Sequence, residues 1–212
     1  MASHGIVAQK VGMTRMVDGQ GVMTPVTLLQ VSKQKVTKVL TPERDGYHGY
    51  QIGYYEKPEK RLRKPDISRL KKSGINEGFT RFKEFRLENA DAKYALGTEL
   101  DVALLEGVKA VDCTGITKGR GFQGAIKRHG SSSGRATHGS CYHNRPGSIG
   151  SNTSPARVWK NKKMPGHMGV DQVTIQNLKV VVVDKEQNLI AVKGSIPGFT
   201  SGYIFVKPSI KA

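Results

Sequence analysis

The 212-residue sequence has few of the features that mark secreted, membrane or disulfide-bonded proteins. Its two cysteines, Cys113 and Cys141, exclude a disulfide framework, and so few thiols are typical of a reducing compartment. It has no run of about 18 apolar residues, and Met1 to Lys10 lacks the charged head and apolar stretch of a signal peptide. We therefore expect a cytoplasmic protein that does not cross a membrane.

Acidic residues are scarce relative to basic ones. Thirty-four Lys and Arg oppose seventeen Asp and Glu, which gives a net charge of +17 and a pI near 10.0. Such a surplus repels itself unless a polyanion neutralises it, so nucleic acid or an anionic membrane surface is the expected partner. The apolar share of 37% is enough for a core, and the length suits one domain with a large insertion or two small domains.

The shortage of acids is concentrated in one stretch, the 58 residues from Cys113 to Val170, which we call the acid-free window. It holds ten of the seventeen net charges, no carboxylate, eleven of the 25 glycines and four of the six histidines. No apolar periodicity persists within it, so we predict that it cannot build a core of its own. Its basic residues are Lys118, Arg120, Lys127, Arg128, Arg135, Arg145, Arg157, Lys160, Lys162 and Lys163.

A second basic run extends from Lys57 to Lys72 and is of a different kind. Glu59 and Asp66 are interleaved with its bases. Interleaved acids leave two interpretations open, a solvated helix face or loop on one side and a contact with RNA on the other.

The sequence on either side of the window is rich in strand signals. Short segments with Val, Ile, Thr or Tyr alternate with turn residues, and a short helix is predicted at 66–73 with Asp66 as its cap and Gly74 as its stop. Strands at this spacing indicate a closed antiparallel barrel from which the window protrudes. The predicted strand segments are 5–11, 24–31, 35–40, 50–55, 173–183, 189–192 and 203–206, and the segment 97–111 carries another strand-like stretch.

Residues Gly119 to Gly124 match the pattern G-x-G-x-x-G of dinucleotide-binding loops. That fingerprint requires a βαβ unit and an acidic residue about 20 positions further on, and no acid occurs before Asp171. A nucleotide cofactor is therefore not expected. The glycines instead allow backbone amides to approach phosphates closely, while neighbouring bases supply the charge.

Metal binding and catalysis are also poorly supported. His138, Cys141 and His143 lie close together, and Cys113 or His129 would complete a zinc site, but paired metal-binding knuckles are absent. A Cys141 nucleophile activated by His143 has no carboxylate in the window to orient the base. We predict no metal, no cofactor, no catalytic residue and no small-molecule substrate. An RNA-modifying enzyme is disfavoured for the same reason, whereas a DNA-compacting protein or general nucleic-acid chaperone would share the charge pattern.

Trp159, the only tryptophan, lies beside Lys160, Lys162 and Lys163. Two roles are open for its indole ring. In the first role the ring would stack on a nucleic-acid base, which is worth about 1–3 kcal/mol in comparable cases. In the second it would anchor the root of the window, where it leaves the strand-rich part, against the barrel or the RNA backbone.

Separated blocks along nearly the whole chain resemble the bacterial large-subunit ribosomal protein three, the L-three family. The resemblance is densest inside the window, where it extends well beyond the glycine motif. The matching blocks are Lys10–Thr14, Gly21, Pro25–Thr27, Val111–Asp112, Thr114–Gly115, Thr117–Phe122, Gly124, Lys127–Arg128, Thr137–Gly139, Pro146–Gly150, Pro155, Lys162–Met164, Gly166–Gly169, Leu189–Gly194 and Val206–Pro208.

The resemblance implies a mainly β fold with a six-stranded, translation-factor-like antiparallel barrel, a small α-containing insertion and a long loop that penetrates rRNA. It places the barrel in 1–114 together with 170–212, the small insertion at about 56–95, and the basic extension in 115–169. It further implies a non-enzymatic constituent of the large subunit that binds 23S rRNA early in assembly and contacts neighbouring ribosomal proteins.

The resemblance also identifies candidate site residues. The loop tip, 146–155, would lie near the peptidyl transferase centre. Thr153 occupies the position where some members carry a methylated glutamine, so we predict no such modification, and the segment 140–145 is one residue shorter than is common. The predicted tip residues are Gly147, Ser148, Ser151, Asn152 and Thr153, and the predicted rRNA-binding residues are Lys118, Arg120, Lys127, Arg128, Arg135, His138, Arg145, Arg157, Trp159, Lys160, Lys162 and Lys163.

Overall fold

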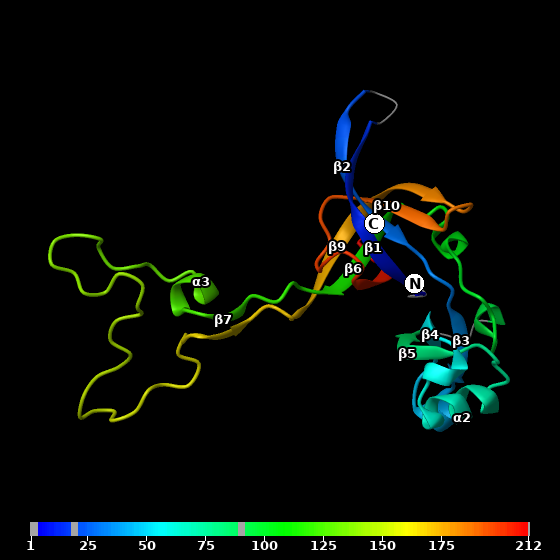
Figure 1. The fold of residues 1–212 in the computed structure, drawn as a ribbon, viewed down its shortest axis with the longest axis horizontal. Helices are drawn as coiled ribbons and strands as arrows, with labels where there is room; N and C mark the ends of the chain where they lie inside the picture. The colour runs from blue at the N-terminus through cyan, green and yellow to red at the C-terminus, as the bar shows by residue number, and fades with distance from the viewer. Residues whose placement is uncertain (1–3, 18–20, 89–91, 212) are drawn as a thin grey trace. The chain divides into compact units, whose positions relative to one another are not determined.

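A computed structural model describes residues 4–17, 21–88 and 92–211, and the chain divides into two compact units (Figure 1). Unit 1 comprises Met1–Ile116 and Gln172–Ala212, and unit 2 comprises Thr117–Asp171. In sequence, unit 2 is an insertion between strands β6 (Ala110–Ile116) and β9 (Gln172–Asp184) of unit 1. Unit 2 therefore contains most of the acid-free window.

Unit 1 is mainly β, with a six-stranded antiparallel sheet. Its strand order is β1-β11-β6-β9-β10-β2, and β2 also pairs with β1, so that each strand has two partners. The expectation of a mainly β fold with a six-stranded antiparallel sheet is confirmed. The remaining strands of this sheet are β1 (Ile6–Val17), β2 (Met23–Gln30), β10 (Leu189–Lys193) and β11 (Tyr203–Pro208).

A second, three-stranded antiparallel sheet forms within unit 1 in the order β3-β4-β5. Helix α2 (Lys64–Lys72) contributes Leu70 to a small apolar cluster with Ile75, Phe79 and Phe82. The elements of this region are β3 (Lys35–Leu40), α1 (Pro42–Asp45), β4 (Gly49–Glu56), β5 (Phe79–Arg86) and three short 3₁₀ helices, Glu59–Arg61, Ala92–Tyr94 and Val102–Leu105.

The two sheets share one hydrophobic core, and Tyr50 of β4 lies within it. The side chain has no exposed surface, and its ring stacks on that of Tyr94 with the centroids 4.1 Å apart. Its hydroxyl accepts a hydrogen bond from Gly5 N at 2.7 Å and donates one to Gly5 O at 2.8 Å. Phe85 from the three-stranded sheet and Val206 from the six-stranded sheet are buried in the same cluster. This core fixes the sheets against each other, because close packing leaves little freedom at their contact.

Two local predictions were wrong. The segment 97–111 is not one strand: Val102–Leu105 forms a 3₁₀ helix, and β6 begins only at Ala110. The apolar residues of this segment indicated burial, and residues in a single turn of helix can be buried as fully as residues in a strand. Asp66 is not the cap of α2, because the helix begins at Lys64, and a proline in its first turn already has a helix-compatible φ. The β-strand at 79–86 was not predicted.

Unit 2 has little regular structure. Strands β7 (Gly121–Gln123) and β8 (Gly166–Met168) pair antiparallel, and helix α3 (Ala125–His129) follows β7. Residues 131–165 form neither helix nor strand (Figure 1). Both clusters of buried apolar side chains lie in unit 1, in agreement with the prediction that the window builds no core.

Candidate nucleic-acid interface

Hydrogen bonds hold the two ends of unit 2 against each other. Thr117 N donates to Asp171 O at 2.9 Å, Asp171 N donates to the Thr117 hydroxyl at 3.1 Å, and Arg120 N donates to Met168 O at 2.9 Å. Gly169 has a φ of +83°, and a Cβ there would lie 2.3 Å from the carbonyl oxygen of Lys118. Only glycine fits this close approach, which holds the ends of unit 2 together.

The glycine motif lies where β7 leads into α3. Gly121 has a φ of +66°, and Gly124 precedes the first residue of the helix. Strand β7 pairs antiparallel with β8, whereas a dinucleotide fingerprint requires a parallel βαβ unit. The structure therefore gives Gly121 a role in turning the backbone, and the antiparallel pairing does not match a Rossmann-type site.

Helix α3 carries three basic side chains in its last turn, and two of them contact a single carbonyl group. Arg128 Nη1 donates to Met164 O at 2.9 Å, and His129 Nε2 lies 3.1 Å from the same oxygen. Both side chains are half-buried, whereas the neighbouring Lys127 is exposed. Arg128 thus has a structural contact within unit 2. His129 was absent from the predicted site, and only its position beside Arg128 on the helix hinted at this role.

The cationic side chains of the window are almost all at the surface. Nine of the ten are exposed, and Arg128 is the half-buried exception. Because the window contains no Asp or Glu, these exposed cations have no carboxylate of the window to pair with. The structure thus leaves their charge available to an external anion. The nine are Lys118, Arg120, Lys127, Arg135, Arg145, Arg157, Lys160, Lys162 and Lys163.

Trp159 retains an exposed ring with a cation over it. Its side chain is 62% exposed, and the guanidinium carbon of Arg157 lies 4.8 Å from the ring centroid. Such a pair offers a flat aromatic surface and a positive charge at one place, a combination that suits both base stacking and phosphate contact. The exposed ring is thus placed for either stacking on a base or contact with the RNA backbone.

The predicted tip residues are close together in one exposed loop. The Ser148 hydroxyl donates to Gly150 O at 2.9 Å, and Gly147 has a φ of +72°. Gly147 is half-buried, and the other four predicted tip residues are exposed. The loop therefore presents small polar side chains, which allow another molecule to approach the backbone closely.

The sulfur and imidazole groups do not form a metal centre. Cys113 is buried in β6, where burial, helped by nearby Asp112, raises the pKa of its thiol to about 12. Cys141, His138 and His143 are exposed in unit 2. Across the described parts of the chain, no group of three or more His, Cys, Asp or Glu residues is placed to hold a metal ion. No described helix is both long and apolar enough to span a membrane.

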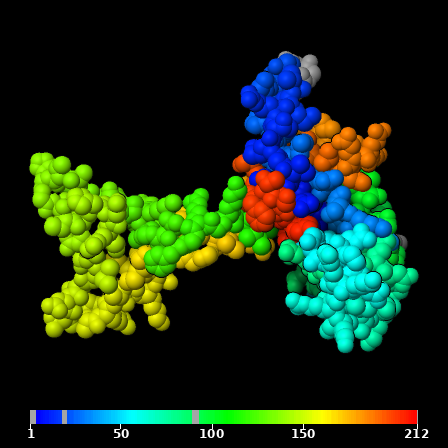
Figure 2. Space-filling view, viewed as in Figure 1, coloured from blue at the N-terminus to red at the C-terminus, as the bar shows by residue number. Residues whose placement is uncertain are grey.

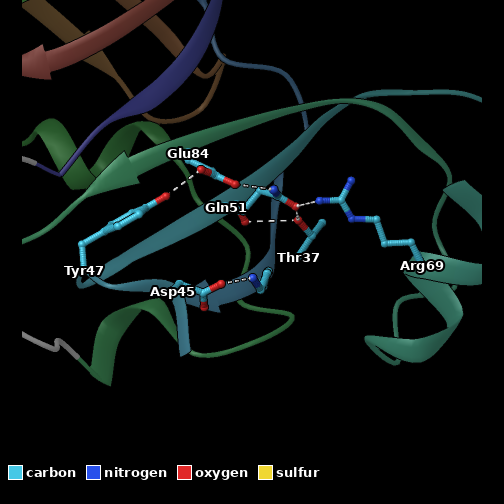
Figure 3. Close-up of polar contacts among 7 residues, drawn as sticks. Thr37, Asp45, Tyr47, Gln51, Arg69 and Glu84 are labelled. Carbon is cyan, nitrogen blue, oxygen red and sulfur yellow. Dashed lines mark hydrogen bonds and ion pairs between the residues drawn. The ribbon is translucent and has the colours of Figure 1, made fainter. Parts of the chain in front are cut away.

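The second basic run is partly used inside unit 1. Arg69 Nη2 donates to Gln51 Oε1 at 2.8 Å, and Gln51 Nε2 donates to Glu84 Oε1 at 3.0 Å, which forms a network on one side of the three-stranded sheet (Figure 3). The Lys71 ammonium lies 2.8 Å from a Glu59 carboxylate oxygen. Arg69 and Lys71 thus have polar partners inside unit 1.

Comparison with known proteins agrees with this arrangement. A family model described as Ribosomal protein L3 matches residues 86–192. Proteins named "Large ribosomal subunit protein uL3" are similar over almost the full length. The one from Vibrio cholerae is 47% identical over 209 residues, covering 98% of this chain and 99% of its own, and the one from Alkaliphilus metalliredigens is 45% identical over 207 residues, covering 98% of both.

The mainly β unit with its inserted basic segment, together with these relatives, identifies the chain as a ribosomal protein. The identity and coverage of these relatives are specific enough to go further: the chain belongs to the ribosomal protein L3 family, whose bacterial members are named uL3. Members of this family are generally structural rather than catalytic, and their place is the ribosome.

Proposed function

We propose that the chain is a structural constituent of the large ribosomal subunit that binds 23S rRNA, supports early subunit assembly and contacts neighbouring ribosomal proteins. In this proposal the six-stranded sheet is a translation-factor-like barrel, formed by 1–114 and 170–212 with a small insertion at about 56–95. Residues 115–169 are an extension that enters the rRNA, and its tip, 146–155, lies near the peptidyl transferase centre.

The observation that carries the proposal is the set of nine exposed cations in a segment without a carboxylate. Inside folded RNA, a carboxylate would be buried beside phosphates with no counterion, and both desolvation and repulsion would oppose it. Exposed Lys and Arg side chains are favoured there because each neutralises a phosphate and releases condensed counterions. A segment of this composition has few apolar contacts to offset its ordering entropy, so RNA supplies the missing interactions.

The tip proposal is supported by family membership together with the chemistry of the loop. Ser151, Asn152 and Thr153 are exposed, small and uncharged. Such side chains hydrogen-bond to phosphate, ribose or base without adding charge to a catalytic RNA centre. Loop substitutions would therefore alter the local RNA packing more than the overall affinity.

Deleting unit 2 tests the proposal. Ile116 and Gln172 are directly paired partners in β6 and β9, so the dipeptide Asn-Gly, which favours a tight hairpin turn, can replace residues 117–171. We expect a folded unit 1 that no longer co-sediments with large subunits at high salt, because the nine exposed cations are gone. Circular dichroism and thermal melting check the fold of the shortened chain. Binding of the wild-type chain to RNA and to DNA of the same length checks whether it is a general polyanion-binding protein.

Retention of the shortened chain on large subunits at the wild-type level would refute the proposal. If the shortened chain does not fold, a full-length variant decides instead, with Lys160, Lys162 and Lys163 changed to Gln. This variant keeps the length of the window and removes three exposed charges, and it should be released from large subunits at a lower salt concentration than the wild type.

A further inference from the structure

A row of basic and aromatic side chains lies on unit 1, outside the acid-free window. The guanidinium carbon of Arg81 in β5 lies 5.2 Å from the ring centroid of Tyr203 in β11 and 5.8 Å from that of Tyr55. The ammonium of Lys83 lies 4.7 Å from the ring centroid of Phe205. We call this surface the cationic–aromatic face, and its members are Tyr55, Lys57, Arg81, Lys83, Tyr203, Phe205 and Lys207.

Strand alternation explains why these side chains gather. Successive side chains of a strand point to opposite faces, so Arg81 and Lys83 share the side of β5 that carries buried Phe85. On β11, Tyr203, Phe205 and Lys207 lie opposite the buried Ile204 and Val206. The two strands belong to different sheets, and the contacts of Arg81 with Tyr203 and of Lys83 with Phe205 show that they lie side by side. In Figure 2 the red atoms of the C-terminal part of the chain border turquoise atoms of the part that contains the three-stranded sheet.

The cations of this face are not compensated by ion pairs. Within the described residues, Lys57, Arg81, Lys83 and Lys207 have no carboxylate within ion-pair distance, although other lysines of unit 1, such as Lys35, do. Burial and the nearby Lys83 ammonium lower the pKa of Lys207, against the opposing influence of Asp112. Two like charges are thus held near each other, and a bound anion would relieve their repulsion.

The backbone of Tyr55 is a second, independent observation. Its φ is +65°, in the left-handed region that bulky side chains rarely adopt. The side chain is nevertheless 39% exposed, at the edge of the face and beside the ammonium of Lys57, which lies 5.0 Å from the ring centroid. Uncommon backbone conformations of this kind are often found where a side chain is presented to a ligand.

We propose that the cationic–aromatic face is a second RNA-binding surface, which takes backbone phosphates at Arg81, Lys83 and Lys207 and an unpaired base or ribose at Tyr55. A basic surface that carries aromatic rings suits single-stranded or irregular RNA, whose bases are free to stack. The inference rests on the proposed rRNA-binding function, but it assigns a contact to unit 1 that the window does not provide. Together, the two surfaces would bind separate segments of the same rRNA.

A full-length variant with Arg81→Gln, Lys83→Gln and Lys207→Gln tests the inference by its affinity for purified 23S rRNA, measured by filter binding over a series of KCl concentrations. Removing one phosphate contact reduces the slope of log affinity against log salt by about 0.7, so the slope should weaken by about 2. At moderate salt we expect affinity to fall roughly tenfold. A variant that binds with the wild-type slope and affinity would overturn the inference.

A matched control removes the same charge from another exposed part of unit 1. Lys60, Lys64 and Lys72 are exposed members of the second basic run, and their change to Gln should alter the slope by less than half as much. An equal loss in this control would show that the cationic–aromatic face contributes no more than another basic surface of unit 1, and would also overturn the inference.

The window variant with Lys160, Lys162 and Lys163 changed to Gln separates the inference from the proposed function. If this variant loses affinity and the face variant does not, the inference fails and the proposed function stands. If neither variant loses affinity, the proposed function fails as well. If the variant with Arg81, Lys83 and Lys207 changed to Gln does not fold, the single change Arg81→Gln tests the inference instead. Arg81 is the exposed residue of the three, and the expected change in slope is about 0.7.

Discussion

Three neighbouring lysines of the window provide a quantitative test of how it binds RNA. Lys160, Lys162 and Lys163 are exposed, and no carboxylate of the window is available to pair with them. Changing all three to Gln removes charge while keeping polarity and chain length. If each lysine contacts one phosphate, the slope of log affinity against log salt weakens by about 2, because each contact contributes about 0.7 on single-stranded RNA.

The same arithmetic bounds the slope for the whole window. All ten cations together would give a slope of about −7. Arg128 is half-buried and donates to the Met164 carbonyl at 2.9 Å, so its charge serves an internal contact. The nine exposed cations then give about −6 as the steepest contribution that the window can make.

Filter binding to 23S rRNA across a KCl series measures both quantities. The control with Lys60, Lys64 and Lys72 changed to Gln corrects for the general effect of removing three charges. A wild-type slope weaker than about −2 would refute binding by phosphate neutralisation. An unchanged slope in the Lys160, Lys162 and Lys163 variant would show that these lysines do not contact phosphate.

Two further predictions concern unit 1 and the thiols. Tyr50→Phe should lower the free energy of unfolding by about 1–3 kcal/mol, because it leaves the buried N–H and C=O of Gly5 without their hydroxyl partner; chemical denaturation measures this. Burial raises the pKa of the Tyr50 hydroxyl above its ordinary value near 10, so the folded state keeps this proton at a pH where the unfolded state loses it. The free energy of unfolding therefore falls as the pH rises above about 10, and it should fall less steeply in the Tyr50→Phe variant. A thiol reagent should modify exposed Cys141 in the folded protein and buried Cys113 only in denaturant.

The controls for these two predictions are simple. Tyr47→Phe removes a hydroxyl whose hydrogen bond to Glu84 is exposed, so it should cost much less stability than Tyr50→Phe. Equal losses would contradict the argument from burial. For the thiols, Cys141→Ser should leave the folded protein unreactive, and rapid modification of that variant would contradict the buried position of Cys113.

The predicted and observed strands differ where a residue is buried without lying in a strand, or lies in a strand without a regular apolar pattern. Residues 35–40 were predicted as a strand and form β3, because their short run of Val and Thr suits a half-buried pleated surface. Val102 and Leu105 are as apolar as strand residues, yet they are buried from a 3₁₀ helix. Strand β5 was missed because charged residues interrupt its pattern, and its aromatic residues are matched to neighbours that only the fold supplies.

The candidate sites differ in how far the sequence reveals them. The exposed cations of the window are contiguous in the chain, so composition alone locates them. The cationic–aromatic face combines β4, β5 and β11, with Arg81 and Tyr203 more than a hundred positions apart. No local pattern predicts such a contact, because it depends on how two sheets pack.

The sequence by itself determined that this protein has a strand-rich part with a core and a basic, acid-free segment without one. Charge and apolar content are properties of the residues themselves, so they are readable before folding. The tertiary structure decided that strands 35–40 and 50–55 belong to a separate sheet, that Arg128 binds the Met164 carbonyl, and that Arg81 meets Tyr203. These outcomes depend on packing between residues distant in the chain, and packing selects one arrangement among many that the local sequence allows.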